Sequence, residues 1–168
     1  MSARPEIPAG LPGGPDPASK VVDLAAARAR LDAARAAGQQ VAFTNGCFDL
    51  LHTGHARLLQ TARAAADLLV VAINSDASVA RLKGAGRPRV PAADRAYMLA
   101  LYPFVDLVTS FDEDDPMALL EALRPDVLVK GGDYVPDTVV GRDLVESYGG
   151  RVIIAPMVPG RSSSSLGE

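Results

Sequence analysis

The chain has 168 residues, of which 48% are hydrophobic and 22% charged, and this length and composition suit one globular domain with a single core. Seventeen lysines and arginines against twenty aspartates and glutamates leave a net charge of −3, which is too small to indicate bulk binding to nucleic acid. No run of 18 apolar residues could cross a membrane, and the N-terminus lacks the apolar core of a signal peptide. The single cysteine, Cys47, cannot form an internal disulfide, which predicts a reducing, cytoplasmic location.

The first part of the chain is predicted to contain a leader and one helix. Residues 1–18 are rich in proline and glycine, and we expect them to form a disordered leader. Ser19 is expected to cap a helix that reaches about Ala37, and Gly38 is expected to end it.

From residue 40 onwards, short apolar β-type runs alternate with helical patterns. In chain order we expect strand 40–44, helix 54–65, strand 68–74, helix 76–82, helix 91–101, strand 106–110, helix 116–123, strand 126–130, helix 138–148 and strand 151–155. Helix starts are expected at Asp76, Pro91, Pro116, and either Asp137 or Thr138. This alternation predicts an α/β fold, a Rossmann-like five-stranded parallel sheet with helices on both faces.

Residues 44–55 (TNGCFDLLHTGH), which follow the first strand, are the most informative segment. A strand followed by a glycine-containing turn and a helix N-terminus offers backbone N–H groups to an anion. Asn45-Gly46 is expected to form a tight turn, and this glycine and Gly54 to allow a ligand close to the backbone. His52 and His55, the only two histidines, can donate hydrogen bonds to phosphate oxygens and, if protonated, stabilise charge in a transition state. The segment therefore predicts a phosphate site.

Two other interpretations of the same segment use different chemistry. His52 and His55 with Cys47 and Asp49 could bind zinc, although nothing else in the chain has metal-ligand spacing. Cys47 could be a nucleophile activated by the helix N-terminus, but no third group is present to orient a base. The GxGxxG and GxxxxGK[ST] motifs are absent after the first strand, which disfavours a dinucleotide or P-loop site.

Several other segments should lie beside this one. The carboxyl ends of parallel strands share one edge, so residues 74–76 and 130–133 are expected to meet residues 44–55 there. A basic run could recognise a small polyanion or form a solvated loop; it comprises Arg81, Lys83, Arg87, Arg89 and Arg95. The acidic residues 112–115 are expected to complement the dipole of the following helix rather than to bind metal.

These motifs resemble a known family. Residues 44–49 followed by His52-Thr53-Gly54-His55 resemble the HxGH signature of the cytidylyltransferase-like nucleotidyltransferases. Residues 72–76, residues 81–84 with Arg87-Pro88, and residues 129–134 resemble the adenylyltransferase domain of the heptose-phosphate enzymes. The resemblance extends over about residues 20–165.

The resemblance implies that AMP is transferred from ATP to D-glycero-D-manno-heptose 1-phosphate by direct in-line attack, giving ADP-heptose and pyrophosphate. It also implies Mg²⁺ bound mainly through nucleotide phosphates, without a protein cage. A cytidylyltransferase acting on glycerol 3-phosphate or another small phosphorylated substrate is the first alternative. A nucleotide-binding module without turnover is the second.

The resemblance also assigns roles to residues. His52, His55 and Lys83 are expected to be catalytic. The expected nucleotide contacts are Thr44, Asn45, Gly46, Cys47, Phe48, Gly54, Lys130, Gly131, Gly132, Asp133, Ser162, Ser163 and Ser164. The expected substrate contacts are Asp49, Asn74, Asp76, Arg87, Arg95 and Tyr134.

The domain organisation follows from the same comparison of motifs. We expect the nucleotidyltransferase domain to occupy residues 19–160, with a serine-rich tail at 161–168 whose serines contact the ligand rather than remain flexible. Many relatives fuse this domain to a sugar kinase, and the short leader implies a kinase on a separate chain of the same pathway. The family also implies a homodimer.

Overall fold

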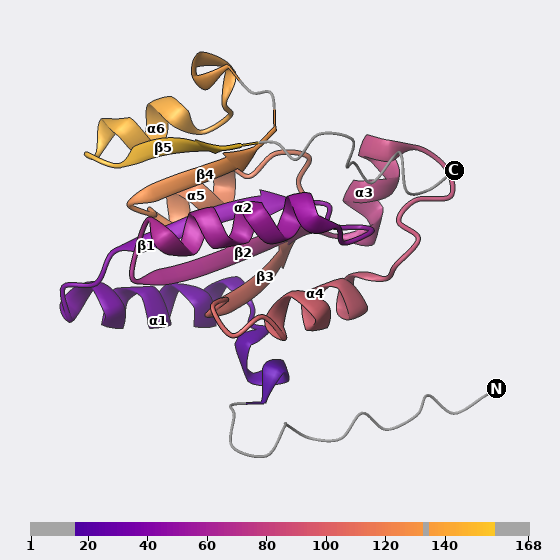
Figure 1. Ribbon diagram of the computed structural model, residues 1–168, viewed down its shortest axis with the longest axis horizontal. Helices are drawn as coiled ribbons and strands as arrows, with labels where there is room; N and C mark the ends of the chain where they lie inside the picture. Colours follow the sequence, from indigo (N-terminus) through magenta and orange to yellow (C-terminus); the bar gives the residue numbers. More distant parts are fainter. Residues whose placement is uncertain (1–15, 133–134, 157–168) are drawn as a thin grey trace.

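Five parallel strands form the centre of the fold, in the order β3-β2-β1-β4-β5 (Figure 1). The computed structural model describes residues 16–132 and 135–156. The strands are β1 Val41–Gly46, β2 Leu68–Asn74, β3 Leu107–Phe111, β4 Val127–Gly131 and β5 Arg151–Ala155. The predicted parallel sheet is therefore confirmed, and its strand order reverses between β1 and β4.

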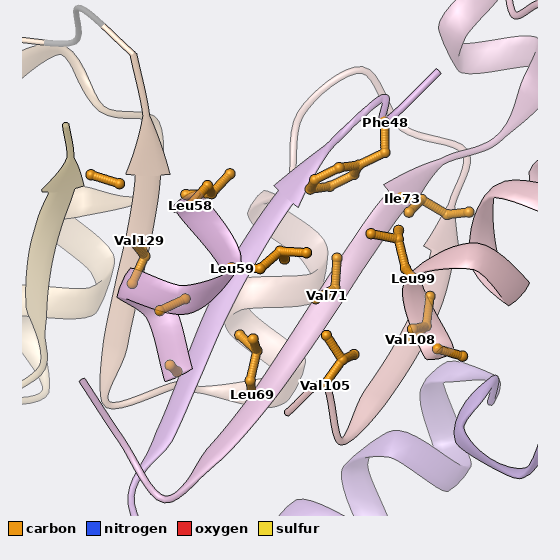
Figure 2. Close-up of a cluster of buried hydrophobic side chains, with 14 of the residues drawn as sticks. Phe48, Leu58, Leu59, Leu69, Val71, Ile73, Leu99, Val105, Val108 and Val129 are labelled. Carbon is orange, nitrogen blue, oxygen red and sulfur yellow. The ribbon is translucent and has the colours of Figure 1, made fainter. Parts of the chain in front are cut away.

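Helices connect the strands and cover both faces of the sheet (Figure 1). They are α1 Leu24–Ala36, α2 Thr53–Ala64, α3 Asp76–Lys83, α4 Ala92–Ala100, α5 Met117–Leu123 and α6 Arg142–Ser147, with the 3₁₀ turns η1 Pro17–Lys20 and η2 Pro136–Thr138. Within β2, Val71 packs into one apolar cluster and Val70 into the other, because successive strand residues point to opposite faces. Figure 2 shows the first cluster, in which α2 contributes Leu59 and α4 contributes Leu99. β2 is thus buried on both faces, as its continuous apolar run predicts.

The N-terminal part of the described chain differs from the prediction. Residues 17–18, assigned to the leader, belong to η1, and η1 and α1 replace the single helix expected from Ser19. Asp23 caps α1 by accepting a hydrogen bond from the backbone N–H of Ala26 at 2.7 Å. Gly38, with φ +77°, follows the end of α1 as expected. Residues 1–15, the rest of the predicted leader, lie outside the described residues.

Two helix starts also differ from those predicted. Ser75, not Asp76, caps α3 by accepting from the backbone N–H of Ser78 at 3.0 Å. The helix expected from Asp137 or Thr138 is only α6, which begins after Gly141. This glycine has φ +91°, and a Cβ atom there would lie 2.1 Å from Leu120 Cδ1, so the packing of the neighbouring helix fixes where α6 can begin.

The predicted Asn45-Gly46 turn is wrong, because both residues continue β1. Asn45 pairs with Ala72 and Gly46 with Ile73 in the parallel ladder to β2. The chain instead changes direction at Phe48, which has φ +48°. In the part of the chain that the structure describes, no helix is long and apolar enough to span a membrane.

Candidate functional site

A cleft of about 740 Å³ lies at the carboxyl ends of β1, β2 and β4, beside the point where the strand order reverses. Fourteen of the residues expected to contact nucleotide or substrate line it: Asn45, Gly46, Cys47, Phe48, Asp49, His52, Gly54, His55, Asn74, Lys83, Arg87, Lys130, Gly131 and Gly132. The fold therefore brings together motifs that are up to 87 residues apart in sequence, from Asn45 to Gly132 (132 − 45).

The two histidines begin α2 and hold each other in place. His52 is the N-cap, and its Nδ1 accepts a hydrogen bond from the backbone N–H of Gly54 at 3.1 Å. His55 Nδ1 accepts from the backbone N–H of His52 at 3.4 Å, which completes a capping box built from imidazoles. The rings stack with centroids 3.9 Å apart, and both residues line the cleft.

This capping box determines which nitrogen of each ring carries the proton. Because Nδ1 accepts a hydrogen bond in both residues, each ring, when it is neutral, carries its proton on Nε2. Burial, and secondarily the charge of His52, lower the pKa of His55 from 6.5 to about 4. His55 is therefore neutral at pH 7 in the free protein, where it does not carry the positive charge that the second of its two predicted roles requires. It offers an Nε2–H donor instead.

The lowered pKa of His55 predicts how stability depends on pH. Between about pH 4 and 6.5 the unfolded chain binds a proton at His55 that the folded chain does not bind. The stability that neutral His55 contributes to the folded protein is therefore fully present above pH 6.5, and it is lost as the pH falls towards 4. Urea unfolding from pH 7 to 4.5 should show a decline that is less steep in His55→Asn, which cannot titrate. Equal slopes in the two proteins would contradict the lowered pKa.

Phe48 packs against His55. Its side chain is buried, and its ring centroid lies 5.0 Å from that of His55. A Cβ atom at Gly46 would lie 3.3 Å from the Phe48 ring, so this glycine makes room for the ring as well as lining the cleft. The aromatic contact offsets the cost of a positive φ at a non-glycine residue.

Lys130 brings a positive charge to the cleft from the end of β4. Its Nζ donates to Asn45 Oδ1, which links β4 to β1 across the reversal point. Burial lowers the pKa of Lys130 from 10.5 to about 8. The ammonium group is therefore still mostly charged at pH 7, and an anionic ligand beside it would raise its pKa again.

Asp49 links residues 87–90 to the segment that carries the histidines. Arg87 Nη1 donates to Asp49 Oδ2 at 2.7 Å, and the backbone N–H groups of Arg89 and Val90 donate to Oδ1 at 2.7 and 3.0 Å. Burial would raise the pKa of Asp49, but the hydrogen bonds from these three residues outweigh it, and the pKa is lowered. The carboxylate expected to bind substrate is thus engaged with the protein, and it positions Arg87 at the cleft.

Three predicted contact residues, Thr44, Asp76 and Arg95, do not line the cleft. Thr44 and Arg95 are 0% and 1% exposed. Arg95 donates to the main-chain oxygens of Val90, Cys47 and Asn74 at 2.8, 2.6 and 2.9 Å, and to Asp76 Oδ1 at 2.7 Å. We therefore correct its expected role. It joins three cleft-forming segments and does not contact substrate itself.

The predicted contacts Asp133, Tyr134, Ser162, Ser163 and Ser164 lie outside the described residues. Sequence reasoning also missed members of the cleft, among them Leu82, Val140, Asp114 and Asp115. Asp115 Oδ1 accepts from the backbone N–H of Met117 at 2.9 Å, so it does complement the start of α5 as expected.

Two of the carboxylates that line the cleft are paired with arginines. Asp114 pairs with Arg81 at 2.9 Å, and Asp49 is engaged with Arg87. Among the described residues, no three His, Cys, Asp or Glu side chains form a group that could hold an ion, so the zinc interpretation gains no support. Burial also raises the pKa of the Cys47 thiol, although Lys83 and Arg95 act in the opposite direction, and this disfavours a thiolate nucleophile.

Comparisons with known proteins give the family. The model of the family described as "Cytidylyltransferase-like" matches residues 43–164. The "Bifunctional protein HldE" of Geotalea uraniireducens is 54% identical over 154 residues, which are 92% of this chain and 31% of that protein. The protein of the same name from Syntrophotalea carbinolica is 56% identical over 138 residues, which are 82% and 28% of the two chains. The chain therefore spans about a third of the length of these curated relatives.

Solved structures agree with this assignment. The lipopolysaccharide core biosynthesis protein from Thermoplasma volcanium is 26% identical, with a TM-score of 0.58, over 71% of this chain and 97% of that one. The pantoate-beta-alanine ligase from Francisella tularensis has a TM-score of 0.59 over 86% of this chain and 68% of that one, but at 14% identity it shows the fold alone. Together with the matched residues and the HxGH segment at the cleft, these findings show that the chain belongs to the cytidylyltransferase-like family.

Proposed function

We propose that the protein transfers AMP from ATP to D-glycero-D-manno-heptose 1-phosphate, giving ADP-heptose and pyrophosphate. The observation that carries this proposal is the pair of imidazoles at the start of α2, whose Nδ1 atoms accept from the backbone and which both line the cleft. The identity to the HldE proteins and the branch-specific motifs support the choice of substrates.

The reaction is a direct displacement at phosphorus. A phosphate oxygen of the acceptor attacks the α-phosphorus of ATP and forms the new P–O bond. The bond from the α-phosphorus to the α,β-bridging oxygen breaks, and pyrophosphate leaves with the electron pair, so no covalent enzyme intermediate is needed. The protein contributes positioning and charge stabilisation.

His52 and His55 would act on the charge that develops during this displacement. Their Nε2–H groups donate to oxygens of the triphosphate, and because α2 already fixes both rings, no reorganisation is needed as the reaction proceeds. On one side of β1, Lys83 and Arg87 receive the acceptor phosphate. On the other side, Lys130 with Gly131 and Gly132 receives the nucleotide. Mg²⁺, when bound to the nucleotide phosphates, supplies further neutralisation of their charge.

The proposal is tested by measuring pyrophosphate. The purified chain with Mg²⁺ is given ATP or CTP, each against heptose 1-phosphate and glycerol 3-phosphate. Release with ATP and the heptose alone is the expected result. Release with CTP and glycerol 3-phosphate would instead identify a cytidylyltransferase, and nucleotide binding without release would identify a non-catalytic module.

Lys83→Ala should weaken use of the acceptor. Lys83 is exposed at the end of α3 and lines the cleft, so its loss removes a charge-assisted contact to the acceptor phosphate. We expect kcat/KM for the acceptor to fall by about 10- to 100-fold. Arg89→Ala is the matched control, because its side chain carries the same charge in the adjacent loop without lining the cleft. Equal kinetics in wild type and Lys83→Ala would remove Lys83 from the site.

The remaining parts of the proposal concern the whole protein. We propose that it works in the cytoplasm as a homodimer. Sedimentation of the purified protein tests the dimer directly.

A further inference from the structure

Asn74, the last residue of β2, places a buried amide at the floor of the cleft. The residue is 3% exposed and lines the cleft next to Cys47. Its main-chain oxygen is occupied by Arg95 Nη1 at 2.9 Å. The backbone of Asn74 is thus fixed by Arg95. The orientation of the side-chain amide then determines whether its nitrogen or its oxygen faces a ligand.

Neighbouring groups fix that orientation. Ser78 Oγ donates to the main-chain oxygen of Glu113 at 2.9 Å and therefore accepts from Asn74 Nδ2 at 3.0 Å. Nδ2 also lies 3.5 Å from the same Glu113 oxygen, which can only accept. The amide nitrogen must therefore face Ser78 and Glu113, and the amide oxygen faces Cys47.

The amide oxygen is left poorly satisfied. Within the part of the chain that the structure describes, its hydrogen-bond partner is the Cys47 thiol, with Sγ 3.9 Å from Oδ1. A thiol is a weak donor, and an amide oxygen can accept two hydrogen bonds. Because an unsatisfied buried acceptor is costly, a donor supplied by a ligand would be favoured at this place.

We propose that Asn74 Oδ1 accepts a hydrogen bond from a hydroxyl group of the phosphorylated acceptor and makes the site selective for acceptors that carry that hydroxyl. This inference rests on the proposed function. Asn74 ends β2, on the same side of β1 as Lys83 and Arg87, whereas Lys130 ends β4 on the other side. A hydroxyl is the uncharged donor that a sugar phosphate brings, and a site built to bind one rejects an analogue that lacks it.

The test compares substrates within each enzyme. For wild type and Asn74→Ala, kcat/KM is measured with heptose 1-phosphate and with its 2-, 3-, 4-, 6- and 7-deoxy analogues. In wild type, one analogue should be worse than the parent by about 10- to 100-fold. In Asn74→Ala that ratio should fall close to one. A ratio within one enzyme is unaffected by a smaller folded fraction, so partial unfolding of the variant does not hide the result.

Two further variants separate this role from a general effect of packing. Ser78→Ala removes the group that orients the amide, so its ratio should fall between those of wild type and Asn74→Ala. Thr109→Val replaces a buried hydroxyl that lies away from the cleft lining, and it should keep the wild-type ratio.

Distinct results overturn the two proposals. An unchanged ratio in Asn74→Ala, or no discrimination by wild type, overturns the role of Asn74 while leaving the proposed function intact. The role of Asn74 is also overturned if Asn74→Ala loses discrimination against 2′- or 3′-deoxy-ATP instead, because Asn74 would then contact the nucleotide and not the acceptor. Failure of wild type to release pyrophosphate with the parent sugar phosphate overturns the proposed function, and this inference with it.

Discussion

Replacing His55 with alanine should lower kcat by about 10²–10³-fold, the effect of removing one donor aimed at the charge of a transition state. The ring lines the cleft and its Nδ1 is occupied by the backbone N–H of His52, so the substitution removes the Nε2–H donor and part of the helix cap together. Steady-state pyrophosphate release measures the catalytic loss, and urea unfolding measures the contribution of the cap, about 1 kcal/mol.

Two conservative variants separate these effects. His55→Asn places an acceptor near the position of Nδ1 but nothing at Nε2, so it should preserve stability and lose turnover. His55→Gln extends an amide to about the position of Nε2 and should recover part of the turnover. Gln60→Ala, on the exposed side of α2, controls for a general change in the helix. If His55→Asn turned over at nearly the wild-type rate, the ring would have no part in the chemistry.

Arg95→Met should lower the free energy of unfolding by about 3–5 kcal/mol, because it leaves buried acceptors without a donor. The arginine is 1% exposed and bonds to the main-chain oxygens of Val90, Cys47 and Asn74. Such a loss is a large part of the 5–15 kcal/mol that typically stabilises a domain. Urea unfolding monitored by circular dichroism gives the value.

Asp76→Asn is the matched control for Arg95→Met. It removes the charge of the partner but keeps an oxygen for Arg95 Nη2 and for the backbone N–H of Ala92. Because the Asp76 side chain is 51% exposed, the change should cost less than about 1 kcal/mol. If Arg95→Met were as stable as Asp76→Asn, the three carbonyl contacts would contribute nothing, and the account of Arg95 as the link between cleft segments would be wrong.

The sequence correctly predicted those elements whose pattern depends only on their own residues. The bounds of β2 and β5 agree with the prediction because each strand is an apolar run between clear breaks. The Asn45-Gly46 turn was wrong because pairing with Ala72 and Ile73, far along the chain, keeps β1 extended. The start of α6 was wrong for a similar reason, since it depends on contact between Gly141 and Leu120.

The site shows the same division between local and tertiary information. Sequence motifs identified most of the cleft lining because the carboxyl ends of parallel strands necessarily meet. They could not show that Arg95 is buried, since arginine is rarely buried and three of the four groups that pair with it come from distant segments. Nor could they show that burial and the charge of His52 lower the pKa of His55, because both depend on how the fold arranges the residues around that ring.

The central claim is that the imidazoles at the start of α2 bind the triphosphate through their Nε2 atoms. A crystal structure of the complex with Mg²⁺ and the α,β-methylene analogue of ATP tests it most directly. The claim predicts the Nε2 atoms of His52 and His55 within about 2.7–3.2 Å of phosphate oxygens, with both Nδ1 contacts to the backbone retained. A triphosphate bound elsewhere, or rings turned away from it, would contradict the claim.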